Sequence, residues 1–163
     1  MKKIITLLLA MTMLLSLTAC KAKEPEKKQP ETMGEALLMD FEERTADKKE
    51  QTVQELADGL LTNSWIKFSG ASMAVEEGYL TGFGDAEITG FKEGVMFGPV
   101  IGTIPFVGYV FETADEAGAE TLLKTLTENA DPRWNICTEA EETVSKVSGN
   151  KVFFVMCPKK MEN

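Results

Sequence analysis

The sequence predicts an α+β fold, with a small antiparallel sheet and two or three helices packed mainly on one of its faces. Three observations predict it. Apolar residues recur at helical spacing in segments that begin with a capping pattern. Other segments are short runs rich in β-branched and aromatic residues, as in strands. The last two such runs flank a Ser-Gly-Asn turn, which indicates a hairpin. Helices that cover an antiparallel sheet are the economical arrangement of these elements.

Three helices are predicted to begin with a capping box, in which a Thr hydroxyl and a Glu three residues later satisfy free backbone amides reciprocally. The patterns begin at Thr32, Thr52 and Thr113. An apolar stripe follows clearly after Thr52 and after Thr113. The segment after Thr32 leads into the charged run at residues 42–50, so its helix is defined only at the start.

Strands are predicted where the helical period gives way to apolar and β-branched runs. The predicted segments are residues 65–68, 87–97, 103–112, 143–147 and 151–157. Residues 103–112 are nearly all apolar, which is typical of a strand covered on both faces. Pro105 cannot donate to a strand ladder, so it places the first residues of this segment at an edge or entry point.

The amino terminus indicates export. Lys2 and Lys3 precede an apolar stretch at residues 4–17, which is shorter than the roughly 20 residues that span a bilayer. A basic start followed by such a stretch is typical of a secretory signal peptide. The stretch ends in Leu-Thr-Ala-Cys at residues 17–20, which resembles the lipobox of bacterial lipoproteins. This resemblance implies a diacylglyceryl group on Cys20 and cleavage just before it.

These features predict a signal peptide at residues 1–19, a lipidated Cys20 with a flexible charged tether at residues 20–32, and one globular domain at residues 33–160. The tether has no large apolar side chain, so it cannot bury enough surface to become ordered. Two acyl chains hold a protein stably on a bilayer. We therefore expect a protein anchored to the cell membrane through the lipid on Cys20 and facing the extracytoplasmic side.

Composition excludes several kinds of partner and site. The net charge is −9, and it becomes −11 when the signal peptide takes Lys2 and Lys3 away. Nucleic acid is not an expected partner, because binding its phosphates depends on Lys and Arg. The chain has no histidine. It therefore lacks the usual general base near neutral pH and the commonest transition-metal ligand. We expect no cofactor and no metal.

The region from about Thr52 to Pro158 resembles a family of uncharacterised exported lipoproteins of Gram-positive anaerobes that contain a domain of unknown function. Residues 97–109 (FGPVIGTIPFVGY), 131–139 (DPRWNICTE) and 149–154 (GNKVFF) carry the resemblance. It implies an α+β fold and an extracytoplasmic location. It supplies no activity and no catalytic residues.

Cys137 and Cys157 remain once Cys20 carries lipid. An even pair of cysteines in an exported domain is consistent with a disulfide. The last hairpin strand would end at Cys157, opposite about Ala140, which brings Cys137 within reach. The other interpretation is that both are reduced, buried cysteines that act as small apolar side chains.

Residues 97–109 combine glycines and prolines with apolar side chains. One interpretation is a core strand with an ordered connection beneath the helices. The other is that residues 98–103 form a loop that presents Val100 and Ile101 to an envelope protein or a small apolar ligand. Trp134 is expected to pack where the helix that begins near Thr113 meets the sheet.

No arrangement of residues in the sequence predicts catalysis. The expected function is therefore that of a non-catalytic binding or interaction module with an unknown ligand. One alternative is a cell-envelope enzyme that uses two carboxylates. A deep polar cleft with such a pair would favour it, whereas an apolar groove near Val100 would favour binding. A third interpretation is a structural subunit of an envelope complex.

Overall fold

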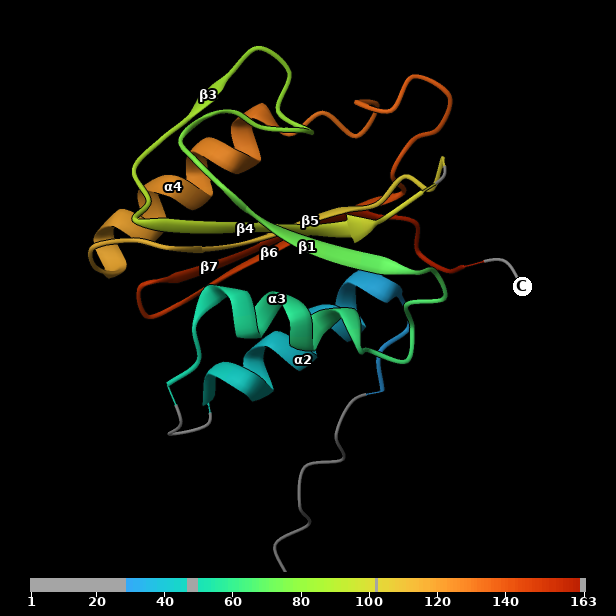
Figure 1. The fold of residues 1–163 in the computed structure, drawn as a ribbon, viewed down its shortest axis with the longest axis horizontal. Helices are drawn as coiled ribbons and strands as arrows, with labels where there is room; N and C mark the ends of the chain where they lie inside the picture. Colours follow the sequence, from blue (N-terminus) through green and yellow to red (C-terminus); the bar gives the residue numbers. More distant parts are fainter. Residues whose placement is uncertain (1–28, 47–49, 102, 162–163) are drawn as a thin grey trace, which may run out of the picture.

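The computed structural model of the chain describes residues 29–46, 50–101 and 103–161. A five-stranded antiparallel sheet lies at the centre of this part (Figure 1). The predicted signal peptide at residues 1–19, Cys20 and the tether up to residue 28 lie outside the described residues.

The strands of the sheet follow the order β1-β4-β5-β7-β6, with every neighbouring pair antiparallel. They are β1 (Gly70–Val75), β4 (Glu93–Pro99), β5 (Val107–Glu112), β6 (Glu142–Ser148) and β7 (Lys151–Cys157). A separate ribbon pairs β2 (Gly78–Tyr79) with β3 (Glu87–Ile88). Strand β5 is central between β4 and β7, and β1 and β6 form the two edges.

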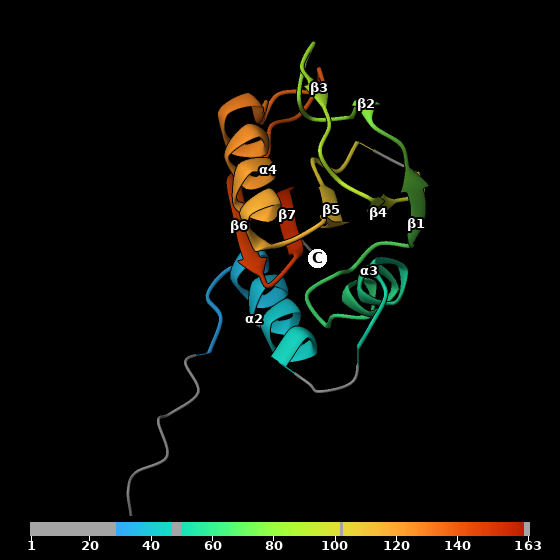
Figure 2. The same ribbon diagram turned by 90° about the vertical axis from the view of Figure 1, so that its left-hand side faces the viewer.

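Helices cover both faces of the sheet. Helices α2 (Met33–Ala46) and α3 (Val53–Leu61) pack on one face, and α4 (Glu116–Asn129) packs on the other (Figure 2). The predicted α+β class, with a small antiparallel sheet, is confirmed, and two of the three helices share a face.

Alternation along β7 divides the apolar interior into two cores, because successive side chains of a strand point to opposite faces. Phe153 faces α2, where its ring stacks on Phe41 with centroids 5.2 Å apart. Phe154 faces the α4 side, with its ring centroid 5.1 Å from that of Phe83. One strand therefore supplies a large buried aromatic to each core.

The three predicted capping boxes have different outcomes. The Thr52–Glu55 box is present in full at the start of α3. At α2, the Thr32 hydroxyl accepts from the amide of Glu35 at 3.2 Å, but the Glu35 carboxylate accepts from the amide of Glu31.

The prediction for Thr113 is wrong. Asp115 is the residue that caps α4, and its carboxylate accepts from the amide of Gly118 at 2.8 Å. The Thr113 side chain is fully buried, and its hydroxyl donates to the carbonyl of Asp115. Burial therefore diverts Thr113 from capping, and the helix begins two residues later than the pattern suggests.

The strand predictions hold best near the carboxyl end. The hairpin of β6 and β7 is confirmed, and its two-residue turn places Gly149 at a φ of +59°, which favours glycine.

Residues 65–68 do not form a strand; the Asn63 side chain accepts from the amide of Trp65, and the segment packs as a loop. Residues 87–97 divide into β3 and β4, because the chain turns at Gly90, with a φ of +94°.

The prediction for residues 103–112 is too long, since β5 begins only at Val107. The amide of Phe106 donates to the carbonyl of Ile104 at 2.8 Å, a tight turn around Pro105. Proline offers no amide for a ladder, so the strand starts after it.

Candidate functional site

An apolar groove lies where β1 and β4 approach the connection between β4 and β5. Its volume is about 290 Å³. The lining residues are Ala71, Ser72, Met73, Met96, Gly98, Pro99 and Val100.

The strand register explains how the sequence builds the groove. Met73 is opposite Met96, and Ala71 is opposite Gly98. These residues belong to the face of the sheet that carries α4, because Met96 packs against the core on that side. Helix α4, however, packs over β6 and β7. The β2–β3 ribbon also lies on this face, where Val75 and Met96 pack against the core (Figure 2). The groove remains at the end of β4, because Gly98 contributes no side chain to fill it.

Val100 and Ile101 follow directly after β4 and are exposed, at 59% and 86% of their accessible area. The amide of Val100 donates to the carbonyl of Ser69 at 2.9 Å, which continues the β1–β4 pairing by one residue. Within residues 97–109, Phe97 and Tyr109 are core residues. The interpretation as a buried connection therefore holds for these flanks and is wrong for Val100 and Ile101.

A second recess of about 200 Å³ adjoins the groove and shares Met96, Gly98 and Pro99 with it. Trp134 and Asn135 also line this recess. Trp134 also packs against the core beneath α4, as the sequence predicts. Two further apolar side chains are exposed. Met73, which lines the groove, is 56% exposed, and Ile136, which follows Asn135, is 96% exposed.

Cys137 and Cys157 are both free thiols, so of the two interpretations the structure has the reduced cysteines and not the disulfide. Cys137 is exposed and Cys157 is buried. Alternation along β7 turns Cys157 toward α2 and α3, whereas the connection that carries Cys137 packs through Trp134 on the opposite face. Moreover, the cross-strand partner of Cys157 is Glu142 rather than Ala140.

Burial raises the pKa of the Cys157 thiol well above its usual range, and the nearby charge of Glu142 raises it further. The thiol donates toward the Glu142 carboxylate at 3.6 Å. A thiol held in its protonated form is a poor nucleophile. Cys157 therefore acts as a core side chain.

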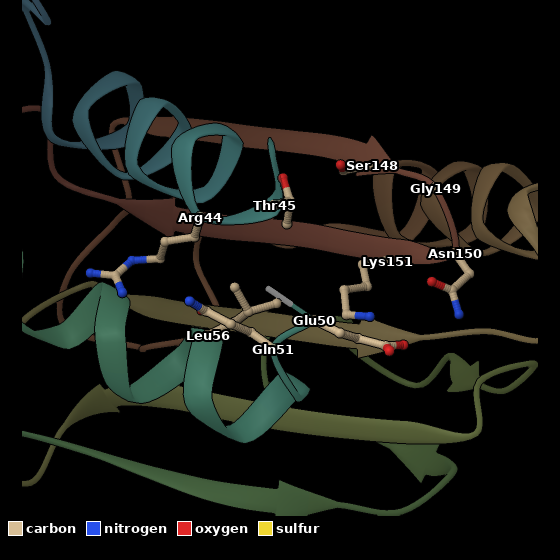
Figure 3. Close-up of a pocket in the computed structure, with 9 residues that line it drawn as sticks. All are labelled: Arg44, Thr45, Glu50, Gln51, Leu56, Ser148, Gly149, Asn150 and Lys151. Carbon is tan, nitrogen blue, oxygen red and sulfur yellow. The ribbon is translucent and has the colours of Figure 1, made fainter. Parts of the chain in front are cut away.

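A polar pocket of about 270 Å³ lies between the end of α2, the start of α3 and the β6–β7 turn (Figure 3). Its lining residues are Arg44, Thr45, Glu50, Gln51, Leu56, Ser148, Gly149, Asn150 and Lys151. Glu50 supplies the one carboxylate among these lining residues, and Figure 3 shows it beside Lys151.

The two cations of this pocket already have partners. Arg44 donates to the Asp40 carboxylate at 2.7 Å and to the carbonyl of Gly59 at 3.0 Å. Lys151 pairs with Glu112 at 3.2 Å, and its side chain is 12% exposed. The pocket thus offers neither a pair of carboxylates nor an unpaired cation from these two side chains.

Two further findings concern the described residues only. Nowhere in residues 29–46, 50–101 and 103–161 do three Cys, Asp or Glu side chains gather closely enough to hold a metal ion. In the same part of the chain, each helix is too short or too polar to cross a bilayer.

Comparisons with known protein families, with curated proteins and with solved structures found no match to the chain. The resemblance to exported lipoproteins described above therefore stays a prediction.

Sequence reasoning identified Val100 and Ile101 but missed Met73 and Met96. Both methionines are ordinary apolar residues in the sequence, and they become a surface feature only through the β1–β4 register. No local signal in the sequence could have found them, because the groove forms between two strands that are distant in the chain.

Proposed function

We propose that the protein is a membrane-anchored extracytoplasmic lipoprotein whose folded domain is a non-catalytic binding module. We place partner binding at the apolar groove beside Val100. The observation that carries this proposal is the gathering of Met73, Met96 and Val100 around an open groove. Exposed apolar patches on a soluble domain commonly mark interaction sites.

The size of the groove favours a protein partner over a small apolar ligand. Pockets that enclose small molecules usually measure about 300–1,000 Å³ and bury most of the ligand. At about 290 Å³, this groove is at the lower limit, and it lies along an edge strand. A segment of another protein could place one or two side chains there and continue along the strand.

The polar pocket does not favour the alternative of an enzyme. The alternative considered was an enzyme with two carboxylates in one cleft, as in glycoside hydrolases. The lining of the pocket includes a single carboxylate, that of Glu50. We therefore argue the binding function alone.

Metabolic labelling tests the anchor. Cells fed a tagged fatty acid should label the wild-type protein and leave the Cys20→Ser variant unlabelled. The thioether requires a thiol, so Cys137→Ser should keep the label and serves as the matched control. A wild-type protein without label would contradict the proposed anchoring.

Photo-crosslinking tests the binding site in living cells. A photoreactive amino acid at Val100 or Met73 should give a discrete adduct of higher mass. The same amino acid at Thr125, on α4, is the control position and should give none. Adducts that are equal at all three positions, or absent from all, would contradict binding at the groove.

A further inference from the structure

Strand β1 has a free outer edge. Among the residues that the structure describes, it pairs only with β4, in a continuous register from Gly70 to Val75. The amide of Val100 donates to the carbonyl of Ser69, and the pairing toward a neighbour alternates along a strand. The backbone groups of Gly70, Ser72 and Ala74 therefore point outward. The amides and carbonyls of these three residues could form hydrogen bonds with an added strand.

The opposite edge of the sheet is protected. Strand β6 carries the charged residues Glu142 and Lys146, and both are bound to α2. The Glu142 carboxylate accepts from the amide of Gly34 at 2.7 Å, and Lys146 pairs with Glu42 at 3.2 Å. Charged side chains and covering elements are the usual means by which proteins prevent strand addition.

Strand β1 has none of these protections. Its sequence, Gly-Ala-Ser-Met-Ala-Val, contains no charge and no proline, and its register contains no bulge. Residues 70, 71, 73 and 74 are exposed. Here one edge of the sheet is protected and the other is not. An unprotected edge strand is typical of a surface that pairs with another strand.

The two faces beside this edge differ in chemistry. On the α4 side, Met73 and the groove are apolar. On the α3 side, the Ser72 hydroxyl forms a short hydrogen bond to the carboxylate of Asp58 and accepts from Gln54 at 2.6 Å. The exposed Glu76 follows directly after the strand. The edge is therefore apolar on the α4 side and has the carboxylate of Asp58 on the α3 side, with Glu76 just beyond the end of the strand.

We infer that β1 is a docking edge for an extended segment of another protein, which adds to the sheet as a sixth strand with apolar side chains over the groove and basic side chains toward Asp58 and Glu76. Because strand residues alternate between faces, the matching segment alternates apolar and basic residues. Main-chain hydrogen bonds supply the pairing, and the two faces supply the selectivity.

Charge argues for a foreign segment over a second copy of this chain. Two β1 strands paired antiparallel about Ser72 would align Gly70 with Ala74 of the other copy. That arrangement would bring the two Asp58 carboxylates to the same face of the joined sheet, each next to one of the paired Ser72 residues. Like charges at the centre of an interface destabilise it, and the whole chain carries a net charge of −9. A basic segment meets no such repulsion.

This inference rests on the proposed function, since it names the class of partner for the same surface, and it is tested separately.

The probe is a seven-residue peptide of alternating Lys and Val, with fluorescein attached, added to the purified full chain in detergent. A block isomer with the same composition and an alternating Glu/Val peptide are the controls. Fluorescence anisotropy should show binding at least tenfold tighter for the Lys/Val alternation than for either control. Equal binding of the isomers, or none, overturns the inference.

A substitution at the outer edge tests the geometry. Ala74→Pro removes an amide that points outward, so the pairing with β4 is kept, as at other edge prolines. It should weaken binding of the alternating peptide at least tenfold, whereas Ala74→Ser should change it less than twofold. A proline variant with native circular dichroism and unchanged affinity overturns the inference.

Hydrogen exchange on the unmodified chain gives a readout that needs no variant. The alternating peptide should slow exchange of the Ser72 and Ala74 amides at least tenfold and leave the amides of β6 unchanged. Absence of this protection overturns the inference. Dimerisation that depends on concentration and that Ala74→Pro abolishes also overturns it, because the edge would then bind a second copy of this chain. Cellular crosslinks from Val100 that persist in Ala74→Pro would keep the groove as a binding site and remove strand addition.

Discussion

Cys157 and Tyr109 show how burial controls chemistry at single residues. The pKa of each side chain lies well above its usual range, and in both cases the main cause is loss of water around the charged form. Tyr109 keeps its proton and donates it to the carbonyl of Thr81 at 2.8 Å. The hydroxyl thereby holds the loop that carries Phe83 against the sheet.

These buried groups predict that stability falls at alkaline pH. In the unfolded chain the Cys157 thiol loses its proton near its ordinary pKa of 9.0, whereas the folded protein keeps that proton. Above this pH the unfolded state binds fewer protons, so the free energy of unfolding decreases as pH rises. The slope contributed by one such group approaches about 1.4 kcal/mol per pH unit.

Urea unfolding of the wild type and of Cys157→Ala at pH 7.5, 8.5 and 9.5 measures this effect. The wild type should lose stability more steeply than the variant between the two higher values. Parallel pH profiles would show that the thiol is not held protonated by the fold.

At the scale of elements, the sequence predicted those whose local signals agree with their tertiary surroundings. Helix α3 has a complete capping box and an apolar stripe, and its buried residues Val53, Leu56 and Leu60 follow that stripe. The β6–β7 hairpin has its glycine where the turn needs a positive φ. In both elements the local preference and the packing require the same conformation, so the prediction is correct.

The incorrect predictions occur where packing overrides a local signal. The pattern at Thr113 is a valid capping sequence, but the core buries Thr113 and leaves the capping role to Asp115. Three of the four residues at 65–68 are aromatic or apolar, as in a strand, yet Trp65 and Phe68 contribute their side chains to the core from a loop. The groove had no local signal, because it arises from two strands that are distant in the sequence.

The capping box of α3 gives a prediction at this scale. Thr52→Ala removes the oxygen that accepts from the amide of Glu55 at 3.1 Å. It should lower the free energy of unfolding by about 1 kcal/mol. Thr52→Ser keeps the oxygen and should lie much closer to the wild type in urea unfolding. Equal losses for Ala and Ser would assign the effect to the methyl group of Thr52 and contradict the capping role.

At the scale of the whole molecule, one sheet separates two apolar cores and belongs to both. Trp65 packs against the core beneath α2 and α3, and Trp134 packs against the core beneath α4. Because every buried residue of β7 from Val152 to Cys157 faces one core or the other, neither core can lose its packing without disturbing this strand. The domain should therefore unfold as one unit, as small single domains usually do.

Tryptophan fluorescence provides a probe for each core. In Trp134→Phe the remaining signal of the domain reports the α2–α3 side, and in Trp65→Phe it reports the α4 side. For each variant, the urea midpoint followed by its tryptophan should coincide with the midpoint followed by far-ultraviolet circular dichroism. A fluorescence midpoint that differs from the circular dichroism midpoint by more than about 0.5 M urea would show that the cores unfold independently.

Helix α2 lies beside β6, at the edge of the sheet opposite β1. The amide of Met33 donates to the carbonyl of Lys159 at 2.8 Å, and α2 packs beside β6 from there (Figure 2). With neighbouring strands about 4.8 Å apart, β1 lies roughly 19 Å across the sheet from β6. A strand added beside β1 would therefore lengthen the sheet on the side away from α2. A partner could bind and dissociate at this edge without displacing α2 or its contacts with β6.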